Sequence, residues 1–344
     1  MRSKPIASNR TDACQGRWLL DVLFCKDRAQ VYAVADLGPG VYALAEEAPM
    51  IREMSTSVDE SFIAVPGARL YLREVGTGTP IVVLHGGPDF NHSYLLPEMD
   101  GLAESLRLVY YDQRGRGKSS AGVAPEDVTI GSEIEDLDRV REHLGVDRVT
   151  ILGHSWGSLL AMEYAARHPE RVSHLILMNS APASHADMLR FRAHREADHP
   201  ERLAAMREIA AMPVYAEGDI ETEARYYRFH FGATLRQPEM LDRLVGRLRT
   251  HFIPADIVKA RVIENRLYEQ TWLQPGYDVG ARLAQTGVPV LVIHGEFDFI
   301  PEACARSIVG AAPNGRFTLI PDGGHFSYME CPAETFAAIE EFLR

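Results

Sequence analysis

The stretch that decides the fold is Gly153–Ser158, which reads Gly-His-Ser-Trp-Gly-Ser. It follows the short apolar run Val149–Leu152 and precedes a helix-like run that begins at Leu159. A Gly-x-Ser-x-Gly sequence between a strand and a helix predicts a strained turn that lifts its serine clear of the sheet. Glycine is needed on both sides because a side chain there would collide with neighbouring backbone. We therefore predict that Ser155 is a nucleophile at a helix N-terminus.

Two further residues with acid and base chemistry each follow a predicted strand. Val288–Gly295 has the pattern of a buried strand and is followed by Asp298, and the strand-like run Arg316–Ile320 is followed by His325. A carboxylate can orient an imidazole that removes the proton from a serine hydroxyl. We predict Asp298 as the acid and His325 as the base, with Glu296 as the alternative acid.

Several separate stretches carry a resemblance to a known family. His85–Pro88 reads His-Gly-Gly-Pro, Asp112–Ser119 reads Asp-Gln-Arg-Gly-Arg-Gly-Lys-Ser, and Tyr164–Val172 continues the pattern after the serine turn. With the chain order serine, acid, histidine, residues 60–344 resemble an α/β-hydrolase of the proline iminopeptidase-like (peptidase S33) group. The resemblance implies an α/β fold with a mostly parallel eight-stranded sheet, helices on both faces and a helical cap insertion.

The resemblance also implies which residues contact the substrate. The amides of Gly87 and Trp156 are expected to form the oxyanion hole. Glu264 lies in a stretch similar to the cap segment whose glutamate holds the free amine of the substrate in this family. Asp89 stands where the family usually has glycine, and is expected either to help hold the amine or to narrow the loop against prolyl substrates. The aromatic residues expected along the acyl pocket are Phe90, Tyr94, Trp156 and Phe326.

Other charged residues have more than one interpretation. Glu264 has an alternative as an exposed helix residue paired with an arginine. The family uses a second cap glutamate, for which Glu221 and Glu223 are both candidates. Arg114 and Arg116 are predicted to brace their glycine-rich turn. The acidic residues predicted to form a solvated helix face are Glu133, Glu135, Asp136 and Asp138.

A long interval without strand patterns separates the strand at residues 174–178 from residue 288. We interpret residues 183–285 as the helical cap, inserted between two parts of the hydrolase core at 54–182 and 286–344. Residues 1–53 are interpreted as an N-terminal extension of unknown role. The expected local elements are an opening hairpin at 62–74, helices at 95–105 and 131–144, cap helices at 187–196, 201–211, 219–229 and 238–248, and a final helix at 332–343.

The N-terminal segment matches none of the family's pattern. Residues 31–34 and 41–44 alternate enough to predict strands of an appended hairpin. A second hypothesis is that translation begins at Met54. The segment has no uninterrupted apolar core of a signal peptide, and the chain has no apolar run of membrane-spanning length.

Composition narrows the class of protein. With 344 residues and 46% apolar content, the chain can bury the core of one α/β domain with an insertion. A net charge of −12 disfavours nucleic acid as a partner. We expect no membrane partner, no metal and no cofactor, and a cytoplasmic location; the oligomeric state stays open. The cysteines, whose spacing indicates neither a metal site nor a disulfide framework, are Cys14, Cys25, Cys304 and Cys331.

These features favour a serine hydrolase that forms an acyl-enzyme and acts on a small molecule or short peptide. The favoured activity is an aminopeptidase that releases N-terminal proline or another small apolar residue. A carboxylesterase or lactonase would keep the triad and lack the amine-binding role of Glu264. A C–C bond hydrolase, an acyltransferase and a non-catalytic ligand receptor on the same fold are further alternatives.

Overall fold

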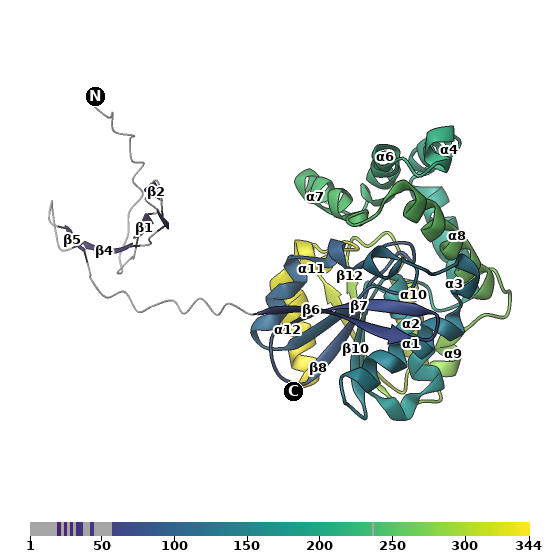
Figure 1. Cartoon of the computed structure of the whole chain (residues 1–344), viewed down its shortest axis with the longest axis horizontal. Coiled ribbons are helices and arrows are strands. Elements are labelled where there is room, and N and C mark those ends of the chain that lie inside the picture. The colour runs from purple at the N-terminus through teal and green to yellow at the C-terminus, as the bar shows by residue number, and fades with distance from the viewer. Residues whose placement is uncertain are drawn as a thin grey trace. The chain divides into compact units, whose positions relative to one another are not determined.

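A computed structural model describes residues 57–344 apart from Arg236, and before them only five short strands. The chain divides into two compact units, Met1–Ser55 and Thr56–Arg344 (Figure 1). In the first unit, β4 (Tyr32–Asp36) pairs antiparallel with β1 (Leu19–Asp21) and β5 (Tyr42–Leu44), and β2 (Phe24–Cys25) pairs with β3 (Arg28–Ala29). Strands β4 and β5 overlap the two predicted strands. The hypothetical start at Met54 and the residue Cys14 lie outside the described residues.

The second unit is built around an eight-stranded sheet in the order β13-β12-β11-β10-β8-β9-β7-β6. Strand β7 runs antiparallel to both its neighbours, and the other pairs are parallel. The predicted mostly parallel eight-stranded sheet is therefore confirmed. The strands are β6 (Val58–Val65), β7 (Ala68–Val75), β8 (Pro80–Leu84), β9 (Arg107–Tyr111), β10 (Val149–His154), β11 (Val172–Met178), β12 (Pro289–Gly295) and β13 (Asn314–Ile320).

Helices cover both faces of this sheet and explain its sequence pattern. Every residue of β8 and β10 is buried, which is why both read as continuous apolar runs. One core cluster joins a sheet face to α1 (Ile130–His143), α2 (Trp156–Arg167) and α10 (Glu302–Ala311). The other cluster joins the opposite face to α11 (Ser327–Glu330) and α12 (Pro332–Leu343). The helices predicted at 131–144 and 332–343 are present.

One predicted core helix is wrong in type. In place of a helix over residues 95–105, the chain forms two 3₁₀ helices, η1 (His92–Leu95) and η2 (Glu98–Glu104). Pro97 lies between them, has no N–H to donate and disfavours helical backbone in the residue before it. The proline therefore divides the segment into two short turns.

The interval between β11 and β12 is mostly helical, and Figure 1 shows α4, α6, α7 and α8 gathered on one side of the second unit. Helices α4, α5, α7 and α8 begin at a proline, a residue suited to the first helical position. The four predicted cap helices correspond to α3, α4, α6 and α7. The helices of this interval are α3 (His185–Asp198), α4 (Pro200–Ala210), α5 (Pro213–Ala216), α6 (Ile220–Phe231), α7 (Pro238–Leu248), α8 (Pro254–Gln270) and α9 (Val279–Leu283).

The glycine-rich loop after β9 is tied to α1 by buried ion pairs. Arg114 donates to Asp136 at 2.5 and 2.7 Å, and Arg116 donates to Glu133 at 2.5 Å. The predicted bracing role of the two arginines is confirmed. The prediction that Glu133 and Asp136 face solvent is wrong, because both are buried against this loop.

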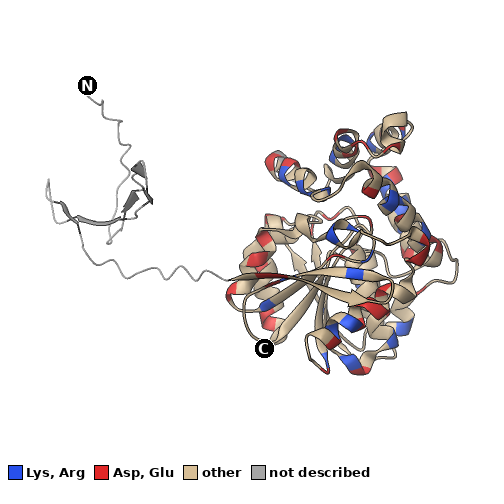
Figure 2. Cartoon of the chain, in the orientation of Figure 1, with Lys and Arg blue, Asp and Glu red and all other residues tan. Residues whose placement is uncertain are grey.

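Charges of both signs are mixed over the helices of the second unit (Figure 2). Many of the arginines take part in ion pairs with carboxylates nearby in space, such as that between Arg73 and Asp100 at 2.7 Å. None of the helices in the described part of the chain is long and apolar enough to cross a membrane.

Candidate active site

The turn around Ser155 has the strained geometry that its sequence predicts. Ser155 has φ 53° and ψ −119° and caps the N-terminus of α2. A Cβ at Gly153 would lie 2.4 Å from the carbonyl oxygen of Gly157, and a Cβ at Gly157 would lie 2.2 Å from that of Leu84. Both distances are far below van der Waals contact, so only glycine fits at either position.

Asp298 and His325 follow β12 and β13 and meet in a buried pair. The His325 Nδ1 lies 2.9 and 3.1 Å from the two carboxylate oxygens of Asp298. Burial raises the pKa of Asp298, but the neighbouring His325 outweighs it and lowers this pKa to about 2. Glu296, the alternative acid, is exposed and accepts a hydrogen bond from the amide of Asp322 at 3.1 Å. Asp298 is therefore the carboxylate that contacts the histidine.

Two residues without a role in the sequence prediction hold this pair in place. Asn179 follows β11 with φ 47°, and its Nδ2 donates to the Asp298 carboxylate at 3.0 Å. The backbone N–H of His325 donates to the hydroxyl of Thr234 at 2.7 Å. Thr234 lies between α6 and α7, so the cap itself helps to position the histidine loop. A polar residue directly after a parallel strand was the available signal for Asn179; no local signal marks Thr234.

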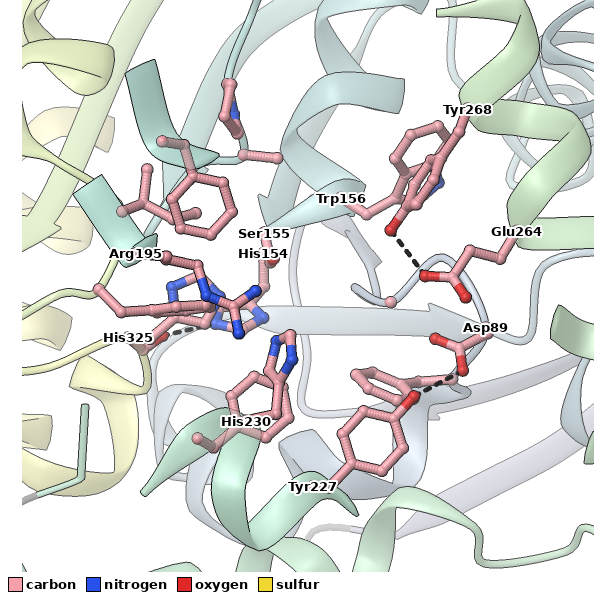
Figure 3. Close-up of a pocket in the computed structure, with 18 of the residues that line it drawn as sticks. Asp89, His154, Ser155, Trp156, Arg195, Tyr227, His230, Glu264, Tyr268 and His325 are labelled. Carbon is pink, nitrogen blue, oxygen red and sulfur yellow. Dashed lines mark hydrogen bonds between the residues drawn. The ribbon is translucent and has the colours of Figure 1, made fainter. Parts of the chain in front are cut away.

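Ser155 and His325 both line one cavity of about 340 Å³ (Figure 3). No hydrogen bond between the Ser155 hydroxyl and His325 is present among the contacts of the described residues. In enzymes without substrate, hydrogen bonds of this kind are often long and shorten on substrate binding. The structure thus brings the three predicted triad residues to one cavity, while their catalytic roles remain predictions.

A hydrogen-bond chain connects the loop before Ser155 to the histidine loop. The Gly86 N–H donates to the Tyr94 hydroxyl at 2.7 Å, and that hydroxyl donates to Nδ1 of His154 at 2.7 Å. The His154 Nε2 then donates to the His325 carbonyl at 2.9 Å. Burial, with the nearby charge of His325, lowers the pKa of His154 to about 3, so its ring stays neutral. The sequence pattern quoted His154 beside the serine, but gave no hint of this bracing role.

The predicted oxyanion loop lies against the serine turn. A Cβ at Gly86 would lie 3.0 Å from that of Ser155. Gly87 has φ +118°, and a Cβ there would lie 2.3 Å from the amide nitrogen of Asp89. Trp156 is the first residue of α2, and the first amides of a helix have no acceptor within it. Gly87 and Trp156 both line the cavity, as does Phe90.

Asp89 and Glu264 are carboxylates in the lining of the same cavity. The Asp89 carboxylate accepts hydrogen bonds from the Tyr227 hydroxyl at 2.8 Å and from Arg249 at 2.5 Å. Glu264 accepts a hydrogen bond from Tyr268 at 2.6 Å, and none of the ion pairs among the described residues involves it. Burial and the charge of Asp89 raise the pKa of Glu264 to about 8. The alternative of an exposed Glu264 paired with an arginine does not fit this geometry.

The two other cap glutamates lie outside the cavity lining. Glu223 is buried and forms ion pairs with Arg249 at 2.8 Å and with Arg261. Glu221 is exposed in the first turn of α6. Asp89, rather than either glutamate, is the carboxylate that shares the cavity with Glu264.

The comparisons with known proteins agree with this architecture. A family model described as the alpha/beta hydrolase fold matches residues 79–332. The chain belongs to the α/β-hydrolase fold family. A proline iminopeptidase of Heyndrickxia coagulans is 29% identical to this hydrolase over 300 residues, which cover 83% of this chain and 98% of the relative.

Solved structures give the same result. A crystal structure of a proline iminopeptidase from Mycobacterium smegmatis matches with a TM-score of 0.63 and 25% identity over 83% of this chain and 97% of the other. A thermophilic esterase from Thermogutta terrifontis matches with a TM-score of 0.58 and 25% identity over 83% and 98% of the two chains. The chain is thus similar both to proline iminopeptidases and to an esterase of this fold. Among the described residues, no group of three or more histidine, cysteine or acidic side chains is placed to hold a metal ion.

The cavity of this hydrolase also has a basic part that the sequence prediction missed. Arg195 on α3 and His230 on α6 line it, as do the predicted aromatic residues Tyr94 and Phe326. Both basic residues lie on cap helices whose contacts with the core depend on the folded cap. The sequence around each residue gave no local signal that its side chain lines the cavity.

Proposed function

We propose that this hydrolase is an aminopeptidase that releases N-terminal proline or another small apolar residue from a short peptide. The observation that carries the proposal is Glu264, a carboxylate that lines the cavity of Ser155 beside Asp89 and has no ion pair with any of the described residues. An ammonium group is the substrate feature that such a pair of carboxylates would bind most strongly. The proposed compartment is the cytoplasm.

The proposed reaction begins at Ser155. His325 removes the proton from the serine hydroxyl as its oxygen attacks the scissile carbonyl carbon. Asp298 orients the imidazole through Nδ1 and stabilises its cationic form. The amides of Gly87 and Trp156 donate to the negative oxygen of the tetrahedral intermediate, where losing one such donor typically costs about 3 to 4 kcal/mol.

The intermediate then breaks its C–N bond, and His325 passes its proton to the leaving amine. The N-terminal residue remains as an ester on Ser155. A water molecule, deprotonated by His325, attacks this ester, and the second tetrahedral intermediate releases the free amino acid and restores the serine. Apart from the substrate and this water molecule, the proposed chemistry uses side chains and backbone amides of this chain.

Amine recognition would restrict cleavage to the N-terminal residue. An internal peptide bond presents a neutral amide to Glu264. A free ammonium group instead offers Glu264 a positive partner for a charge-assisted hydrogen bond, so the two substrates differ in affinity. Phe90, with its ring 5.1 Å from that of Tyr227, provides an apolar surface for a small side chain or a proline ring.

A carboxylesterase or lactonase is the second candidate function. The raised pKa of Glu264 favours it, because a protonated glutamic acid would tolerate a neutral acyl group. The same serine chemistry cleaves esters, so the substrate's amine is what separates the two functions.

The test compares kcat/KM for prolyl p-nitroanilide, its N-acetylated form and p-nitrophenyl butyrate, with Ser155→Ala as the blank. Acetylation removes the ammonium group that Glu264 would bind, and losing one partner of a buried charged pair costs about 2 to 5 kcal/mol. We expect kcat/KM for the anilide to fall at least about 30-fold on acetylation. Turnover of the ester alone would reject the aminopeptidase and favour the esterase.

A further inference from the structure

The cavity has acidic side chains on one side of Ser155 and an arginine on the other. Figure 3 shows Glu264 and Asp89 on one side of the serine, and Arg195 with His325 on the other. The acidic side is accounted for by the proposed amine site. Arg195, on the opposite side, has no role in that proposal.

Arg195 is a partly buried cation without an ion pair among the described residues. Its only hydrogen bond there is a weak one to the sulfur of Met206 at 3.5 Å. The guanidinium carbon lies 5.6 Å from the ring centre of Phe191 and 5.7 Å from that of Phe299. Burial lowers the pKa of Arg195, and none of the described carboxylates pairs with it to offset this effect. A guanidinium with unused donors in a cavity is suited to bind a carboxylate.

The position of Arg195 identifies which part of the substrate it would contact. Phe299, on which the guanidinium lies, also packs edge-on against His325 with ring centres 4.6 Å apart. His325 must protonate the leaving amine, so the leaving group lies on the histidine side of Ser155. Arg195 is therefore next to the leaving group, whereas Glu264 is next to the acyl group.

We propose that Arg195 binds the C-terminal carboxylate of the leaving residue, and that the preferred substrates are dipeptides with a free amine and a free carboxylate. This inference rests on the proposed aminopeptidase function. In a dipeptide, one residue separates the scissile bond from the carboxylate, which matches a guanidinium separated from the histidine by the ring of Phe299. A cavity of about 340 Å³ is at the small end of the range for ligand sites, in keeping with a short substrate.

The first test needs only the unaltered protein. We would measure kcat/KM for prolyl-alanine, prolyl-alanine amide and prolyl p-nitroanilide. The first two differ only in the carboxylate, and the third has no carboxylate at all. A charge-assisted hydrogen bond lost from a partly desolvated site predicts that prolyl-alanine is preferred over its amide by roughly 10- to 100-fold.

The second test uses Arg195→Gln and Arg195→Lys. We expect Arg195→Gln to lower kcat/KM for prolyl-alanine roughly 10- to 100-fold, mainly through KM, and to lower that for the amide by less than about threefold. Arg195→Lys keeps the charge without the planar fork and is expected to recover part of the preference. Arg207→Gln is the matched control, because Arg207 is an exposed arginine of the cap outside the cavity lining.

The outcomes separate this inference from the proposed function. Equal kcat/KM values for prolyl-alanine and its amide, with prolyl p-nitroanilide still cleaved, would overturn the carboxylate site and leave the aminopeptidase intact. An equal loss on both peptides in Arg195→Gln would likewise overturn it. If none of the three prolyl substrates is cleaved while p-nitrophenyl butyrate is, both proposals fail.

Discussion

At the scale of a single residue, the ionised form of Glu264 is expected to bind the substrate but to destabilise the folded protein. Its pKa, raised by burial and by Asp89 from 4.5 to about 8, means that the folded protein keeps a proton that the unfolded chain releases. Stability therefore falls as pH rises from about 4.5 to 8, because the folded state binds more protons in that window. We expect Glu264→Gln to raise the free energy of unfolding at pH 8 by about 1 kcal/mol or more, because one pKa unit corresponds to about 1.4 kcal/mol. At pH 5 we expect the same substitution to change the free energy of unfolding little. Calorimetric Tm values at the two pH values measure this effect.

The Glu264→Gln variant should also lower kcat/KM for prolyl p-nitroanilide at least about tenfold. Glu269→Gln, on an exposed position of the same helix, is the control. An identical gain in unfolding free energy at pH 5 and pH 8 would contradict the raised pKa of Glu264.

At the scale of elements, the glycine-rich loop after β9 and helix α1 depend on each other through buried ion pairs. The side chains of Arg116 and Glu133 are both 0% exposed and lie 2.5 Å apart. Glu133→Ala would leave the guanidinium buried without its counter-charge, which typically costs about 3 to 5 kcal/mol. Urea unfolding measures this loss, and Glu135→Ala on the exposed face of α1 should change stability by less than about 0.5 kcal/mol. Comparable losses of unfolding free energy in Glu133→Ala and Glu135→Ala would show that the ion pair of Arg116 and Glu133 adds no stability beyond the helix propensity of the substituted residue.

This pair also illustrates what the sequence can and cannot predict about the elements. The Ser155 turn, Asp298 and His325 each stand at the end of a strand, where apolar runs and glycines give a local signal. Glu133 was assigned to solvent because its partner Arg116 is 17 residues away in a loop, and no local pattern reports that contact.

The same limit applies with more force to the substrate cavity. The contact of Asp89 with Arg249 joins residues 160 positions apart and forms only when the cap folds back over the sheet. Helix α8 was not predicted, although it carries Glu264, because the residue before its first proline is Ile253 rather than a capping serine, threonine or aspartate. Family resemblance located Glu264, whereas Arg195 and the bracing role of His154 needed the folded structure.

At the scale of the whole molecule, the hydrolase machinery belongs to one of the two compact units. The eight-stranded sheet, both large core clusters and every residue that lines the cavity lie within Thr56–Arg344. A unit that contains its own core and its own site is expected to fold and act independently. We therefore expect a chain that begins at Thr56 to keep its Tm within about 3 °C of the full chain and its kcat/KM for prolyl p-nitroanilide within about twofold. Calorimetry and steady-state kinetics on the two purified chains make the comparison. A large loss of activity with unchanged Tm would assign the N-terminal unit a part in substrate binding, and a large fall in Tm would assign it a part in stabilising the hydrolase core. Either result would contradict the expected independence of Thr56–Arg344.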